Sequence, residues 1–272
     1  MNTAIVIYLL LSLLGYSKII IAASISSDVQ AIPSDIASLP FDAVSADEEP
    51  TPSFSRVVGG VHVDIRDYPY QTSVQYSSIH ICSGSIIAES IILTAAHCVS
   101  QKSVSQFSIR AGSNFRNVGG VTRAATAIYV PATYNSSTAD MDIALIYLQS
   151  ALTYGETINA VSLAAYNIII PAGYNATTTG WGDGNFSSRL RGFTVPFVPH
   201  SICRNSYNLT PNMLCAGFAQ ENRNACQGES GGPLVLSRYG QIGIVSWGRG
   251  CSYRVYSSIP ALQEWIYSVS GL

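Results

Sequence analysis

The sequence predicts an all-β fold that ends in one helix, and two patterns carry that prediction. Short runs rich in valine, isoleucine and tyrosine recur between turn-forming residues, as at residues 86–93 and 243–247. Several short strands of this kind are typical of β-barrels. We also expect a helix over about residues 259–269. Its hydrophobic residues follow the i, i+3, i+4, i+7 spacing of an amphipathic helix, at Leu262, Trp265, Ile266 and Val269.

The N-terminal segment differs in composition from the rest of the chain. Residues 1–17 carry no charged side chain, and much of this run is apolar until Lys18 interrupts it. We predict that residues 1–23 form a signal peptide, cleaved between residues 17 and 24, which implies a secreted, extracellular protein. A signal anchor is the alternative, but Lys18 cuts the apolar run short of a membrane span. Stable membrane association is therefore not expected.

An acidic stretch follows the predicted signal peptide. Residues 24–55 contain six Asp or Glu residues, four prolines and no Lys or Arg, a composition that suits a disordered or loosely docked segment. Arg56 then precedes the sequence Val-Val-Gly-Gly at residues 57–60. By itself this pattern also fits a basic residue in front of an ordinary strand.

Charge and cysteine content restrict the classes of function. The chain of 272 residues has 14 Lys+Arg and 16 Asp+Glu, so it is nearly neutral, which argues against nucleic acid as the main partner. Six cysteines fit three disulfides formed in an oxidising compartment, although several pairings are open. We expect no metal site and no cofactor, because the histidines show no metal-ligand spacing; they are His62, His80, His97 and His200.

The most informative stretch is residues 224–233, with the sequence Asn-Ala-Cys-Gln-Gly-Glu-Ser-Gly-Gly-Pro. Its serine is Ser230. Glycines near a serine let a substrate approach closely, and the backbone amides of Gly228 and Ser230 can point at one spot and form an oxyanion hole. A serine hydroxyl is a good nucleophile only when a base takes its proton. Taken alone, the run also fits a glycine-rich turn in any secreted β protein.

Two further motifs precede this run. Leu-Thr-Ala-Ala-His-Cys occupies residues 93–98, and Asp-Ile-Ala-Leu occupies residues 142–145. With the motifs in the order His, Asp, Ser, the chain from about Val57 to its C-terminus resembles the chymotrypsin-like (trypsin-fold) secreted serine proteases. The resemblance implies two six-stranded Greek-key β-barrels and a C-terminal helix, in a serine protease domain at 57–272 with barrels at about 57–165 and 166–257.

The resemblance also implies the catalytic roles. His97 is the general base, and an unperturbed histidine pKa of about 6.5 suits proton transfer near neutral pH. Asp142 holds the His97 ring in the correct tautomer; Asp140 is a competitor, but only Asp142 is followed by Ile-Ala-Leu. Ser230 is the nucleophile that forms an acyl-enzyme during peptide-bond hydrolysis. Ser246 matches a position that hydrogen-bonds Asp142.

Several residues are implied to bind substrate. Ser246, Trp247 and Gly248 match a strand that binds the substrate backbone by β-augmentation, although Trp247 and Gly248 are also ordinary strand residues. Asn224 stands where trypsin-like enzymes carry an aspartate, so we do not expect a preference for Arg or Lys at P1, the residue before the scissile bond. Arg254 falls where most relatives have a pocket glycine. It either binds an acidic P1 side chain, fills the pocket, or points to solvent.

Activation is implied by the same resemblance. Cleavage after Arg56 by an activating protease would remove a propeptide at 24–56, and the new amine of Val57 would pair with the carboxylate before the nucleophile. That residue is Glu229, where the family has aspartate. A failed fit would leave a buried charge at a cost of about 3–5 kcal/mol, whereas a change of rotamer would cost far less. His80 matches a position that holds this carboxylate before activation, or it is a surface histidine.

Three smaller features complete the expectations. Ser83 replaces a glycine that is usual in the family, and it either crowds the cleft or is harmless. The resemblance selects three disulfides, which are Cys82–Cys98, Cys203–Cys215 and Cys226–Cys251. Sequons predict a glycoprotein, with sites at Asn135, Asn175, Asn185 and Asn208.

Two functional classes remain open. The first is a secreted monomeric endopeptidase, made as a zymogen, that acts on protein or peptide substrates and meets protein protease inhibitors. The second is a protease-fold protein with weak or no peptidase activity that binds an inhibitor or an extracellular partner. Glu229, Asn224 and Arg254 favour the second class. Retention of all three triad residues argues against it, because a binding module has no chemical need for them.

Overall fold

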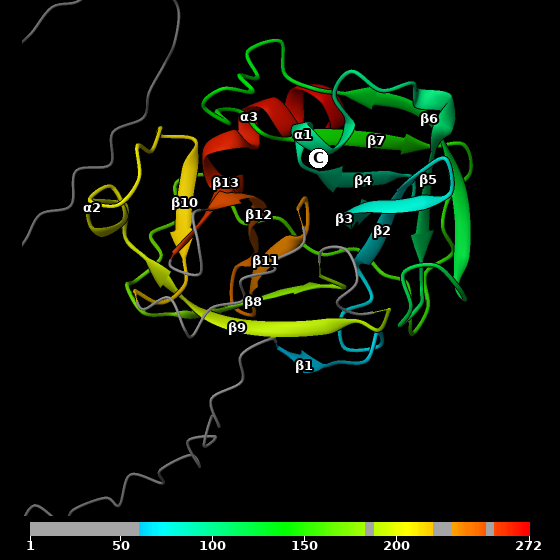
Figure 1. Cartoon of the computed structure of the whole chain (residues 1–272), viewed down its shortest axis with the longest axis horizontal. Helices are drawn as coiled ribbons and strands as arrows, with labels where there is room; N and C mark the ends of the chain where they lie inside the picture. Colours follow the sequence, from blue (N-terminus) through cyan, green and yellow to red (C-terminus); the bar gives the residue numbers. More distant parts are fainter. Residues whose placement is uncertain (1–59, 183–187, 220–229, 249–252) are drawn as a thin grey trace, which may run out of the picture. The chain divides into compact units, whose positions relative to one another are not determined.

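The computed structural model describes residues 60–182, 188–219, 230–248 and 253–272. Six antiparallel strands of its first half close into a barrel, in the order β2-β3-β4-β7-β6-β5 (Figure 1). The strands are β2 (Gln71–Tyr76), β3 (Ile79–Ala88), β4 (Ile91–Thr94), β5 (Phe107–Ala111), β6 (Val121–Tyr129) and β7 (Ala144–Leu148). Two short helical turns, α1 (Ala96–Val99) and η1 (Val104–Gln106), follow β4.

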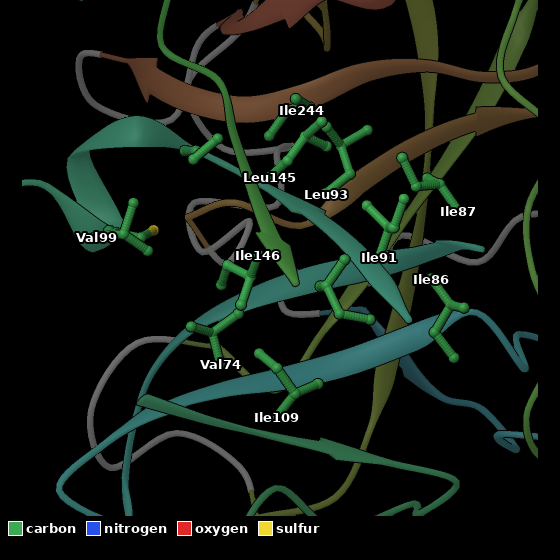
Figure 2. Close-up of a cluster of buried hydrophobic side chains, with 14 of the residues drawn as sticks. Val74, Ile86, Ile87, Ile91, Leu93, Val99, Ile109, Leu145, Ile146 and Ile244 are labelled. Carbon is green, nitrogen blue, oxygen red and sulfur yellow. The ribbon is translucent and has the colours of Figure 1, made fainter. Parts of the chain in front are cut away.

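Hydrophobic side chains from all sides fill this first barrel. Every residue of β4 is buried, and β5 buries alternate residues as a one-sided strand should. Figure 2 shows Val74, Ile109 and Ile146 pointing toward one another from β2, β5 and β7. A close-packed core of branched side chains resists deformation, so β4 and β7 are firm supports for the loops that follow β4 and precede β7.

Strands of the second half form the other barrel. They run in the order β9-β10-β13-β12-β11-β8, and a pairing between β8 and β9 closes the circle. The prediction of two six-stranded barrels in an all-β protein is therefore confirmed. The strands are β8 (Asn175–Gly180), β9 (Arg191–Val198), β10 (Met213–Ala216), β11 (Pro233–Leu236), β12 (Gly240–Gly248) and β13 (Arg254–Ser258), and the short helix α2 (His200–Cys203) lies between β9 and β10.

The first described strand, β1 (Val61–His62), pairs with a strand of the second half of the chain. Val61 and His62 lie opposite Gly192 and Arg191 of β9. By pairing, this segment therefore belongs with the second sheet (Figure 1). A strand of two residues carries no alternation from which a partner can be predicted.

The C-terminal helix, α3 (Ile259–Ser270), begins directly after β13 and ends before Gly271, whose φ of 75° is typical of a helix C-cap. Ile259, Leu262 and Ile266 are buried in the core cluster of the first barrel. Tyr147 of β7 donates a hydrogen bond to the Val269 carbonyl over 2.9 Å. The helix thus fastens the end of the chain to the first barrel. No helix among the described residues is both long and apolar enough to cross a membrane.

Two of the three expected disulfides are present in the described part of the chain. Cys82 of β3 is joined to Cys98 of α1, and Cys203 of α2 is joined to Cys215 of β10. Each closes a loop of 12 to 16 residues, for which loop-closure entropy supplies roughly 3 kcal/mol. The third expected pair, Cys226–Cys251, lies outside the described residues.

Candidate active site

His97 and Asp142 are brought together by the pairing of β4 with β7. Thr94, the last residue of β4, lies opposite Ala144, the first residue of β7. His97 stands just beyond one of these strand ends, in α1, and Asp142 stands just before the other. Two residues that are 45 apart in the sequence therefore meet at one rim of the first barrel.

The contact between these two residues uses both carboxylate oxygens. The His97 ring Nδ1 lies 2.7 Å from Asp142 Oδ2, and the His97 backbone N–H donates to Oδ1 over 2.9 Å. Asp142 is only 1% exposed, whereas the His97 side chain is 33% exposed. An ionised carboxylate only accepts, so Nδ1 is the protonated ring nitrogen, and Nε2 is left as the nitrogen able to accept a proton.

The second barrel holds the same aspartate from the other side. Ser246 of β12 donates to Asp142 Oδ2 over 2.5 Å, as the sequence led us to expect. Ser257 of β13 donates to the Asp142 backbone carbonyl over 2.7 Å, and sequence reasoning missed this residue. Ser257 is buried, so its hydroxyl needs a partner, but no motif in the sequence marks it.

Asp140 does not share the environment of Asp142. Its Oδ1 accepts from Thr210 Oγ1 over 2.6 Å and from Asn212 Nδ2 over 3.0 Å. Both donors belong to the loop that enters β10. Asp140 therefore links the loop between β6 and β7, which also carries Asp142 and is called the Asp142 loop below, to the second barrel instead of facing His97.

The turn that carries Ser230 is seated against the rim of the first barrel. The Ser230 carbonyl accepts from the Ser83 backbone N–H over 2.9 Å. Gly231 has a φ of 78°, and a Cβ atom at this position would overlap Thr94 Oγ1 and lie 3.2 Å from the Ala95 nitrogen. The turn thus packs on the two residues that precede α1, which contains His97.

Comparison with known proteins places this arrangement in a family. A family model described as Trypsin matches residues 57–266. The chain belongs to the trypsin family. Over 223 residues it is 37% identical to the vitellin-degrading protease of Bombyx mori, covering 78% of this chain and 84% of the relative.

Two Drosophila melanogaster proteins are similarly close. Trypsin delta is 40% identical over 228 residues, covering 78% of this chain and 88% of the relative. Trypsin alpha is 39% identical over 231 residues, covering 79% of this chain and 88% of the relative. Together with the family model, these relatives support a serine-type peptidase activity, with proteins as substrates.

Ser83, where this trypsin-family chain departs from the usual glycine, is fully buried. Its Oγ accepts from Gln71 Nε2 over 2.7 Å, and Gln71 Oε1 accepts from Thr179 of β8 over 2.6 Å. The Ser83 side chain therefore lies in a polar network between the barrels and not at the surface of the cleft. Of the two expectations for this residue, crowding of the cleft receives no support from its position.

The strand proposed to bind substrate is the end of β12. Trp247 packs its ring edge-to-face on Tyr207, with centroids 5.2 Å apart. On β13, Arg254 lies opposite Gly248. The Arg254 Cδ atom lies 3.0 Å from the point where a Cβ of Gly248 would stand. The side chain of Arg254 therefore runs across Gly248.

His80 is half-buried. Its Nδ1 lies 2.8 Å from Ser73 Oγ, and its ring meets Trp181 edge-on at 5.8 Å between centroids. Sequon residues Asn135, Asn175 and Asn208 are exposed. The other predicted site residues lie outside the described residues, and they are Arg56, Val57, Asn185, Asn224, Cys226, Gly228, Glu229 and Cys251.

One group of metal-type ligands occurs near the site. Potential ligand atoms of Cys82, His97 and Cys98 lie within 4.8 Å of one another. The two cysteines form a disulfide, so neither offers the thiolate that binds a metal ion. We assign no metal role to this group.

Proposed function

We propose that this chain is the zymogen of a secreted serine endopeptidase that hydrolyses peptide bonds through an acyl-enzyme on Ser230. One observation carries the proposal: the buried carboxylate of Asp142 is hydrogen-bonded to both His97 and Ser246. A solvated aspartate has no need of such partners, whereas a carboxylate that orients a catalytic imidazole does.

The proposed steps follow from this geometry. With Nδ1–H of His97 held by Asp142, Nε2 takes the proton of the Ser230 hydroxyl as the oxygen attacks the substrate carbonyl. The protonated ring then gives this proton to the leaving amine. Water repeats the sequence on the acyl-enzyme and restores Ser230. The end of β12 binds the substrate backbone as an added strand.

Activation and secretion belong to the same proposal. A signal peptide at 1–23 directs export, and cleavage after Arg56 removes the acidic propeptide at 24–56. The freed amine of Val57 then pairs with Glu229, which His80 holds before cleavage. The half-buried position of His80 and the disulfides Cys82–Cys98 and Cys203–Cys215, which suit an oxidising compartment, support this reading.

The test uses the full-length protein, intact and cleaved after Arg56, with a fluorophosphonate probe that labels activated serines. We expect labelling only after cleavage, none in Ser230→Ala, and a rate about 10⁴-fold lower in Asp142→Asn, which holds the wrong tautomer. Circular dichroism checks that each variant is folded. Folded, correctly cleaved protein that takes no label would refute the proposal and leave binding of an inhibitor or extracellular partner as the role.

A further inference from the structure

Arg254 lies across a glycine of the neighbouring strand. It begins β13 and pairs with Gly248 of β12 on one side and with Ala216 of β10 on the other. Its Cδ and Nη1 lie 3.0 Å and 3.5 Å from the place of a Gly248 Cβ. Because Gly248 has no side chain, the arginine lies flat across the strand that is proposed to bind substrate.

The face of β13 that carries Arg254 is the inner face. Side chains alternate along a strand, so Arg254 and Tyr256 share one face while Val255 takes the other. Val255 packs in a cluster with Trp247, and Ala216 and Tyr256 belong to the core of the second barrel. Burial raises the pKa of Tyr256 to about 12, and the charge of Arg254 acts in the opposite direction. Of the three alternatives for Arg254, the solvent-pointing one therefore loses its support.

The same strand connects Arg254 to the nucleophile. The Gly231 N–H donates to the Val245 carbonyl over 2.9 Å, and the Val245 N–H donates to the Gly232 carbonyl over 2.8 Å. Ser230 thus lies beside Val245, and Gly248 follows about 10 Å farther along β12 at the usual strand rise. An extended peptide on this strand, with its carbonyl at Ser230, brings the side chain before the scissile bond toward Gly248.

We propose that Arg254 binds an acidic P1 side chain, so that the enzyme cleaves after glutamate or aspartate. This inference rests on the proposed function for its chemistry. A guanidinium presents parallel N–H donors that match the two oxygens of a carboxylate. A basic P1 side chain would meet like charge at this place, and a neutral amide would offer one acceptor oxygen where a carboxylate offers two.

The first experiment measures turnover by protein cleaved after Arg56, with active sites counted by fluorophosphonate labelling. Peptide substrates differ only at P1, as Glu against Gln and Asp against Asn. We expect kcat/KM to favour the acid by at least about tenfold, the usual worth of a hydrogen bond to a charged group. Arg254→Gln removes this ratio, and Arg238→Gln, which removes an exposed arginine elsewhere, retains it. A Glu/Gln ratio near one, or one unchanged in Arg254→Gln, overturns the inference.

A second experiment measures peptide binding separately from catalysis. Fluorescence anisotropy measures binding of peptide amides that end in Glu or Gln to the cleaved Ser230→Ala protein. Tighter binding of the Glu peptide by at least about tenfold, lost when Arg254→Gln is added, supports the inference even if the wild-type protein takes no label. Equal binding of both peptides, or binding of neither because Arg254 fills the pocket, overturns it.

Discussion

Gly231 sets how closely the Ser230 turn approaches the first barrel. A Cβ there would overlap Thr94 Oγ1 and lie 2.5 Å from the Ser83 carbonyl, and the φ of 78° already disfavours other residues. We expect Gly231→Ala to lower the free energy of unfolding by at least about 2 kcal/mol and to reduce fluorophosphonate labelling. Urea unfolding measures the first effect.

The matched control for this change is Gly155→Ala. A Cβ at Gly155 meets nothing within 4 Å, so this variant should unfold within about 0.5 kcal/mol of the wild type. Equal stability of the two variants would show that the close approach at Gly231 is relieved at little cost.

Ser83 shows what can and what cannot be predicted about a single residue from the sequence. The departure from glycine is visible in the sequence, but its effect depends on where the side chain points. That direction is set by Gln71 and Thr179, and Thr179 is 108 residues away from Gln71. A contact of this separation leaves no local pattern, whereas His97, Asp142 and Ser230 stand within short motifs.

Among the elements, the loop between β6 and β7 is held by Asp140. Its carboxylate accepts hydrogen bonds from Thr210 and Asn212, and the loop also carries Asp142. We expect Asp140→Ala to lower the free energy of unfolding by about 1–3 kcal/mol, because two donors lose their acceptor. The rate of fluorophosphonate labelling should fall as well, because Asp142 is less firmly placed.

Asp67→Ala provides the control for this prediction, since Asp67 is exposed near β1. Its urea midpoint and labelling rate should match those of the wild type. If Asp140→Ala behaves like Asp67→Ala in both measurements, the link between the Asp142 loop and the second barrel contributes nothing.

The C-terminal helix could be predicted because its hydrophobic periodicity is long. The four hydrophobic positions spaced as one helical face predicted α3, which spans Ile259–Ser270. In contrast, β1 has two residues, and its pairing with β9 is decided by tertiary structure. The pairing of β4 with β7 is also nonlocal, yet its result was predictable because the motifs at both ends were recognised.

In the whole molecule, the two barrels are joined by buried polar contacts as well as by α3. Thr179 donates to Gln71, and Ser85 donates to Gln241 over 2.7 Å. Gln71, Ser85 and Gln241 are fully buried. Buried polar groups keep their partners because losing one costs more than the bond itself contributes. These contacts fix the position of one barrel relative to the other, and this keeps Ser246 and Ser257 hydrogen-bonded to Asp142.

Stability of the whole chain at high pH depends on buried tyrosines. Burial raises the pKa of Tyr256 to about 12 and also raises the pKa of Tyr70. The neutral phenol is therefore favoured in the folded state, so the stabilisation is complete below the ordinary tyrosine pKa of about 10 and is lost as pH rises toward 12. We expect the free energy of unfolding to fall in this window, by up to about 3 kcal/mol from Tyr256.

Tyr256→Phe removes the ionisable hydroxyl and should flatten part of this alkaline loss. The control Tyr267→Phe removes an exposed hydroxyl from α3 and should leave the loss as in the wild type. Urea unfolding at pH 8, 10 and 11 measures the three proteins side by side. Identical alkaline loss in both variants would mean that Tyr256 ionises without unfolding the second barrel, and that its burial does not govern stability at high pH.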